Sequence, residues 1–367
     1  GSRTILENAT ETVEIYYYSK STDTQQYRLA QSDTPSAGNV IKRKIWYSVT
    51  AQDNIDSGTW ILLQELGDDA TYAELVTAFE SQLNTSPAGG TPVSVKTTWE
   101  DVPALTGLLD TYPGAAAAYS LRLLDTDYTG DAIRVRRASD STEQDIGFDA
   151  AGDLDTSALA TFCSGTDGFV KVWYDQANSN DATQTTTANQ PKVYDSATGV
   201  VTENGKEALA MSGTQFLRCS ASLTTEDVTL FTVYSADASR ATQEIAGIGE
   251  RASSKMRANI ILTDKHTTSI YNNNLLYDTN AGAQVLHTSV YDYPSTIEGA
   301  INGGTFNTKA VTMLQPSSPI IYVGESSTAS TATTMLGKAQ EVIIYTSDQS
   351  TNRTGIETNI NDHYDIY

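Results

Sequence analysis

The sequence has few of the residues that build metal centres or disulfide-rich folds. Its 367 residues include only two cysteines, Cys163 and Cys219, and three histidines, His266, His287 and His363. The cysteines are far apart without a Cys-x-x-Cys pair, and the histidines are scattered, so no zinc-ligand spacing occurs. We therefore expect no metal site and no cofactor. We also expect the two cysteines to be free thiols.

Positive charge is scarce as well. There are 23 Lys and Arg against 45 Asp and Glu, which gives a formal net charge of −22, and the longest basic run is Lys42-Arg43-Lys44. Binding to a phosphate backbone requires clustered cations, so nucleic acid is a poor candidate partner. No apolar run approaches the roughly 20 residues that a membrane-spanning helix needs, so we expect no membrane partner.

The residues that are abundant favour strands and turns. Thr, Ser, Asn, Asp and Gly are frequent, and there are 20 Tyr. Four strands are expected in the first part of the chain: Val13–Tyr18, Tyr27–Ala30, Val40–Thr50 and Thr59–Leu66. Thr71-Tyr72-Ala73-Glu74 matches a capping box and precedes apolar residues at helical spacing, which predicts one amphipathic helix.

A break in the pattern predicts two domains. The segment 84–92 holds two prolines and two adjacent glycines, and continues neither helix nor central strand. We expect a domain of residues 1–104 and a second of residues 105–367, with protease cleavage between Asn84 and Thr98. From Ala115 short strands recur with turn signals, as in a sandwich or jelly roll. Near the end, Ala339–Tyr345 reads as a strand and Ser350–Tyr364 as a helix.

Three stretches carry a family resemblance: Ala118–Leu124 with Tyr128-Thr129-Gly130, Val135–Asp140, and Trp173–Gln176. In this order and spacing they resemble the catalytic domain of α-L-arabinofuranosidase B, glycoside hydrolase family 54. The resemblance extends over about Leu108 to Tyr364 and implies a concanavalin A-like fold. The expected fold class is mainly β: a concanavalin A-like β-sandwich (jelly roll) preceded by a small N-terminal β-rich domain with one helix.

The resemblance also bears on catalysis. A retaining glycosidase needs two carboxyl groups about 5 Å apart. The position that resembles the family's nucleophile is Asn272, and the one that resembles its acid/base residue lies at or next to Glu325. The cysteine pair that lines the family's sugar pocket has no counterpart in residues 243–247. Because an amide is a far weaker nucleophile than a carboxylate, we expect no catalytic residues and no hydrolysis of an aryl α-L-arabinofuranoside.

The candidate ligand-binding residues are polar side chains near predicted strand ends, where sandwich loops commonly bind ligands. They are Tyr174, Asp175, Glu250, Asn272, Asn273, Asn274 and Glu325. Each also has a structural interpretation: Tyr174 as a packed core aromatic, Asp175 as a turn cap, the three asparagines as a hairpin turn, and the two glutamates as solvated surface.

Three functions fit these observations. The first is a virion-surface protein of a bacteriophage, a tail fibre or capsid decoration, because domains of this resemblance also occur in such proteins. It would bind a host-surface or extracellular glycan, contact other virion proteins through residues 1–104, and form homo-oligomers. The second is a glycosidase that uses rearranged carboxylates such as Glu250 and Glu325. The third is a structural decoration protein without a ligand. A carboxyl pair near 5 Å in the cleft would favour the enzyme.

Overall fold

A computed structural model describes residues 3–7, 12–17, 39–48, 61–66, 94–103, 105–220, 223, 225–250, 252–280, 282–317, 319–325 and 332–367. The chain divides into two compact units, Gly1–Leu105 (unit 1) and Thr106–Tyr367 (unit 2). The expected strand Tyr27–Ala30 and the helix expected after Thr71 lie outside the described residues.

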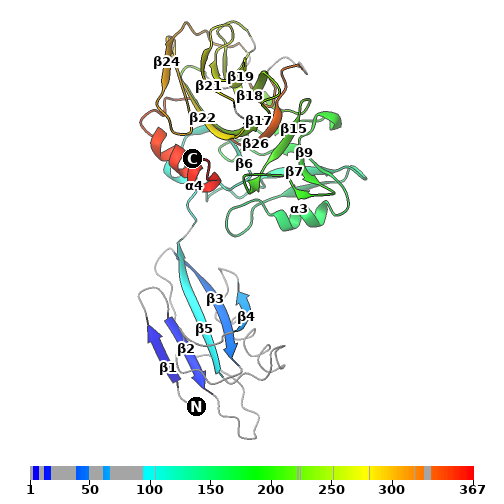
Figure 1. Cartoon of the computed structure of the whole chain (residues 1–367), viewed down its shortest axis with the longest axis vertical. Helices are drawn as coiled ribbons and strands as arrows, with labels where there is room; N and C mark the ends of the chain where they lie inside the picture. Colours follow the sequence, from blue (N-terminus) through cyan, green and yellow to red (C-terminus); the bar gives the residue numbers. More distant parts are fainter. Residues whose placement is uncertain are drawn as a thin grey trace. The chain divides into compact units, whose positions relative to one another are not determined.

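Unit 1 contains an antiparallel sheet with the strand order β1-β2-β5-β3-β4 (Figure 1). The strands are β1 (Arg3–Glu7), β2 (Thr12–Tyr17), β3 (Asn39–Ser48), β4 (Ile61–Leu66) and β5 (Ser94–Pro103). The ends of β2, β3 and β4 differ by at most two residues from those of the strands predicted from the sequence. Strand β5 was not expected, yet it is central and pairs with β3 along its whole length. The cleavage window predicted between Asn84 and Thr98 therefore overlaps a central strand.

The first sheet of unit 2 is antiparallel, with the order β24-β23-β22-β17-β26-β6, and β15 pairs with the first half of β26. Its strands are β6 (Ala115–Ser120), β15 (Leu209–Ser212), β17 (Val228–Ala236), β22 (Gln284–Asp292), β23 (Thr296–Ile301), β24 (Asn307–Ala310) and β26 (Leu336–Tyr345). The strand expected at Ala339–Tyr345 is thus confirmed, as part of β26.

The second sheet has the order β21-β20-β19-β18-β25-β16-β10-β9-β7-β8. Its strands are β7 (Ile133–Arg137), β8 (Glu143–Ile146), β9 (Gly168–Trp173), β10 (Ala182–Thr183), β16 (Leu217–Ser220), β18 (Thr242–Gly249), β19 (Met256–Leu262), β20 (Lys265–Ser269), β21 (Leu275–Thr279) and β25 (Ile320–Val323). The two sheets pack face to face, which confirms the expected sandwich.

Short elements complete unit 2. Strand β11 (Lys192–Asp195) pairs with β9, with β15 and with β12 (Gly199–Val200), so hydrogen bonding continues from one sheet to the other. A separate hairpin joins β13 (Thr202–Glu203) to β14 (Lys206–Glu207). The helices are α2 (Leu108–Thr111), α3 (Thr156–Phe162), the single 3₁₀ turn η1 (Thr187–Asn189) and α4 (Arg353–Tyr364).

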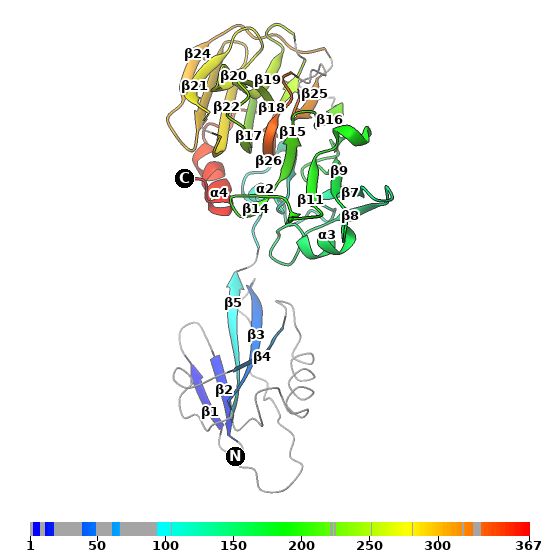
Figure 2. The ribbon, with the colours of Figure 1, turned by 45° about the vertical axis from the view of Figure 1, so that its right-hand side comes forward.

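Helix α4 covers the outer face of the first sheet, as Figures 1 and 2 show beside β22. Its buried residues Ile356, Ile360 and Tyr364 pack in one cluster with Phe231 of β17 and Ile343 of β26. The i, i+4, i+8 spacing predicted this helix correctly, although it begins at Arg353 rather than Ser350.

Polar side chains, rather than apolar ones, join the sheets at one place. The Tyr234 hydroxyl of β17 bonds to Nδ1 of His266 on β20 (2.8 Å) and to Nδ1 of His287 on β22 (3.0 Å). Both histidines are buried, at 2% and 0% exposure. Burial holds the pKa of His266 down at about 4 and that of His287 well below its usual value. Both rings are therefore neutral at pH 7, and we call these three residues with Asn259, Thr268, Tyr277 and Ser289 the histidine network.

Candidate active site and surface groove

Asp175, which follows β9, has an internal structural role. It is 1% exposed, and its carboxylate accepts backbone N–H groups of Ala118, Ala177 and Asn180 at 2.8, 2.9 and 3.1 Å. Burial raises the pKa of this carboxyl group, and the N–H donors oppose that rise. These contacts fit the turn-cap interpretation of Asp175.

Tyr174 belongs to a separate cluster on the same strand end. Its hydroxyl donates to Asp145 at 2.7 Å, and Arg134 forms a bidentate ion pair with that carboxylate. Burial and the adjacent carboxylate raise the pKa of Tyr174 far above its usual value. Tyr174 is thus a hydrogen-bond donor at every physiological pH.

Residues Asn272 to Asn274 form the turn between β20 and β21. Asn272 has a φ of 67° and Tyr271 a φ of 57°, the left-handed conformation that asparagine tolerates. Asn274 accepts a hydrogen bond from Ser269 at 2.8 Å. The turn lies against the start of β19, where the Ser254 amide donates to the Tyr271 carbonyl. The position that resembles the family's nucleophile is therefore a hairpin turn.

Glu250 and Glu325 lie at opposite ends of one strand pair. Strands β18 and β25 are aligned with Gly249 opposite Ile320 and Ala246 opposite Val323. Glu250 follows β18 at one end and Glu325 follows β25 at the other, so about six residues, or about 20 Å, separate them. The expectation that these two carboxylates act together is wrong, because the register keeps them apart.

The neighbour of Glu325 is Glu244, which sequence analysis did not select. The Gly324 amide donates to the Ile245 carbonyl at 2.7 Å, so Glu325 and Glu244 flank the same backbone hydrogen bond. Both are almost fully buried, at 1% and 4% exposure. The Gly324 hydrogen bond therefore places the backbone of Glu325 beside that of Glu244. A retaining glycosidase needs its two carboxyl groups about 5 Å apart.

The backbone at Gly324 fixes how Glu325 enters this site. Gly324 has a φ of 86°, and a Cβ atom added there would lie 2.9 Å from the Gln215 carbonyl oxygen. Only glycine fits both constraints, so the chain turns sharply just before Glu325. This turn ends β25, so Glu325 lies outside the strand, in which successive side chains alternate between the two faces of the sheet.

Arg218 of β16 supplies a positive charge to Glu325. Its Nη2 lies 3.2 Å from Glu325 Oε2, and its guanidinium stacks over the Phe216 ring at 4.7 Å. We call Arg218, Glu244 and Glu325 the glutamate site. One sequence signal could have indicated Glu244: it is an acidic residue directly before the segment 245–248, which has no charged residue.

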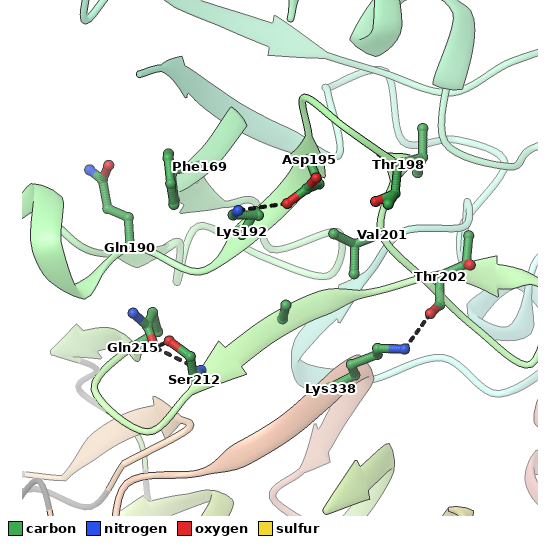
Figure 3. A pocket seen from close by; sticks show the side chains of 12 residues that line it. Phe169, Gln190, Lys192, Asp195, Thr198, Val201, Thr202, Ser212, Gln215 and Lys338 are labelled. Atoms are coloured by element: carbon green, nitrogen blue, oxygen red, sulfur yellow. Dashed lines mark hydrogen bonds and ion pairs between the residues drawn. The ribbon is translucent and has the colours of Figure 1, made fainter. Parts of the chain in front are cut away.

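A groove of about 580 Å³ lies elsewhere on unit 2 (Figure 3). Its floor crosses four neighbouring strands in the order β9, β11, β15 and β26. The residues paired across them are Phe169, Lys192, Ala210 and Lys338, in the same order. Figure 3 shows Phe169, Lys192 and Asp195 on one side, with Ser212, Gln215 and Lys338 facing them. Sequence analysis selected none of its residues, since they come from strands distant along the chain.

Two findings concern metal ions and membranes. Within the described part of the chain, no group of three or more His, Cys, Asp or Glu side chains could hold a metal ion. None of the described helices is long and apolar enough to span a membrane.

Both cysteines are free thiols, with Cys163 buried and Cys219 partly exposed.

Comparisons with known proteins bear on unit 2. The family profile "Alpha-L-arabinofuranosidase B, catalytic" matches residues 109–219. Among solved structures, a Glu-to-Gln mutant of a glycoside hydrolase family 54 α-L-arabinofuranosidase, soaked with 4-nitrophenyl α-L-arabinofuranoside, superposes with a TM-score of 0.55 at 18% identity. The superposition covers 69% of this chain and 64% of that one. Unit 2 has an arabinofuranosidase-like fold.

A second arabinofuranosidase structure, complexed with arabinofuranosyl-α-1,2-xylobiose, agrees with a TM-score of 0.52 at 19% identity. The superposition again covers 69% of this chain and 64% of the arabinofuranosidase. This chain therefore spans less than two thirds of the length of either arabinofuranosidase. No curated protein matches the chain. The expected resemblance to the arabinofuranosidase B catalytic domain is confirmed; nothing in these comparisons concerns bacteriophages.

Proposed function

We propose that unit 2 is a glycoside hydrolase that cleaves α-L-arabinofuranosides at the glutamate site. One observation carries the proposal: Glu244 and Glu325 flank the same backbone hydrogen bond in an arabinofuranosidase-like sandwich. Sequence analysis expected an inactive pocket because Asn272 lacks a carboxylate. The supporting argument is that Glu244, a different residue, brings a second carboxyl group to Glu325.

The two carboxyl groups would divide the chemistry of a retaining hydrolysis. Glu325, which is ion-paired with Arg218, would attack the anomeric carbon. Glu244 would then protonate the departing glycosidic oxygen. In the second step Glu244 would remove a proton from water as that water releases the sugar from Glu325.

The direct test is hydrolysis of an aryl α-L-arabinofuranoside by the full chain and by two single variants. Glu325→Gln and Glu244→Gln should each lower kcat/KM by about 10² to 10⁴-fold, because each removes one of the two carboxyl groups. Glu250→Gln is the matched control and should retain activity, since Glu250 lies at the other end of β18. Absence of turnover by the unmodified chain would contradict the proposal and favour a binding module.

Azide rescue assigns the roles separately. With Glu325→Ala, azide should give a glycosyl azide of inverted anomeric configuration, because azide replaces the attacking carboxylate. With Glu244→Ala, the product should keep its configuration, because Glu325 still forms the covalent intermediate. The opposite pair of products would exchange the two roles and leave the proposed pair intact.

For unit 1 we propose attachment, to further copies of the chain or to a larger assembly such as a virion. Its support is a separate five-stranded sheet, whose outer strands β1 and β4 each pair on one side within the described part of unit 1. Sedimentation velocity tests self-association. A full chain that is monomeric at every concentration would exclude self-association and leave attachment to an assembly of other proteins.

A further inference from the structure

The groove is lined by one aromatic ring and by several polar groups. Phe169 is partly exposed, and the Arg136 guanidinium and Lys192 ammonium lie 5.2 and 5.8 Å from its ring centre. Thr198 and Thr202 bring hydroxyl groups to the same groove. Binding sites for small molecules commonly combine such an apolar surface with a few hydrogen-bonding groups that fix orientation.

The lysines of the groove are already neutralised by carboxylates. Lys192 Nζ lies 2.8 Å from both Asp167 and Asp195. Lys338 Nζ lies 2.8 Å from Glu203 and donates to the Thr202 carbonyl at 2.7 Å. Since the chain as a whole carries a net charge of −22, a polyanion would be repelled from this surface. The groove chemistry therefore suits an uncharged ligand rich in hydroxyl groups.

The dimensions indicate a ligand larger than one sugar. A second depression of about 450 Å³ shares Ala210, Ser212 and Lys338 with the groove, so the two hollows adjoin. Single pockets of about 300 to 1,000 Å³ hold drug-sized molecules. Ala210 leaves the centre of the floor open between two long lysine side chains.

We infer that this groove binds a chain of several neutral sugar units, independently of the glutamate site. The ligand lies across β9, β11, β15 and β26, with its apolar ring faces toward Phe169 and its hydroxyl groups toward Thr198, Thr202 and Gln215. The groove contains neither Glu244 nor Glu325, so it holds sugar chains whether or not they carry arabinofuranose.

Isothermal titration calorimetry of the full chain with xylohexaose, cellohexaose and α-1,5-arabinohexaose tests the inference. At least one of them should bind, and Phe169→Ala should weaken that binding by about two- to tenfold, the range measured for aromatic contacts. Ala210→Gln, which places a longer side chain at the centre of the floor and leaves Phe169 in place, should weaken it as well. The matched control is Phe306→Ala, because Phe306 is also partly exposed and stacked under an arginine, Arg353.

Three results would overturn the inference. They are absence of binding to all three sugars, equal weakening by Phe306→Ala, and tighter binding of tetragalacturonate that is lost in Lys338→Gln. The last result would show an anion site instead. Binding that persists in Glu325→Gln separates this groove from the proposed hydrolysis, since that variant removes a carboxyl group of the glutamate site only.

Discussion

Acid should destabilise unit 2 through the histidine network, and His266→Gln should remove a defined part of that effect. His266 is 2% exposed, and burial lowers its pKa from 6.5 to about 4. Below pH 6.5 the unfolded chain therefore binds a proton at this position that the folded chain refuses. Stability from His266 is complete above pH 6.5 and is lost as the pH falls toward 4.

The magnitude follows from the two pKa values. A displacement from 6.5 to about 4 corresponds to about 3 kcal/mol once the unfolded state is fully protonated and the folded state is not. At pH 5 the loss from His266 alone is about 2 kcal/mol. His287, whose pKa burial also lowers, adds a loss in the same direction.

Urea unfolding at pH 7 and pH 5 measures this loss. The difference in unfolding free energy between the two pH values should shrink by about 2 kcal/mol in His266→Gln, even though the variant is less stable at both. Thr232→Val is the control: Thr232 accepts a hydrogen bond from Asn259 of the histidine network, and it does not titrate. An unchanged pH difference in His266→Gln would refute the reasoning.

Further predictions concern single positions. Asp175→Ala should lower the unfolding free energy by about 3 kcal/mol, measured in urea, because one buried and two partly buried N–H groups lose their acceptor. Asp175→Asn, which keeps one carbonyl oxygen, should lose less. In native protein, Ellman's reagent should modify Cys219 before Cys163, whose buried thiol has its pKa raised to about 11. After denaturation it should count two thiols, and fewer than two would contradict the free state. Limited proteolysis should cut on the N-terminal side of Ser94, and N-terminal sequencing of a fragment that starts within β5 would contradict its place in the sheet.

Local patterns were readable in the sequence. The spacing of Ile356, Ile360 and Tyr364 predicts α4 because a helix brings residues four apart onto one face. The apolar run within Ala339–Tyr345 predicts β26, which is buried along most of its length. Strand β5 was not predicted, because its sequence mixes charged and polar residues and ends at Pro103. A proline at that place favours a domain boundary over a central strand.

The candidate site was harder to predict because it depends on pairing between distant strands. Glu325 was selected for its place after Gly324, a local signal. Glu244 was not selected, because only the pairing of β18 with β25, continued by the hydrogen bond from Gly324 to Ile245, makes it the neighbour of Glu325. The same register places Glu250, which was expected to act together with Glu325, at the opposite end of the strand pair. The groove likewise combines four strands from separate parts of the chain, and no short motif connects them.

The position of β5 has a mechanical consequence. This strand lies between β2 and β3, and its last residue, Pro103, is followed after two residues by Thr106, where unit 2 begins. Tension applied to unit 2 therefore enters unit 1 at the centre of its sheet rather than at an edge. Residues 99–103, which the pull reaches first, pair with β3, and residues 94–98 pair with both β2 and β3. To extract β5, such a pull must therefore break the bonds to β3 along the whole strand and, over its first half, the bonds to β2 as well. The order of strands makes the junction resistant to load along the chain.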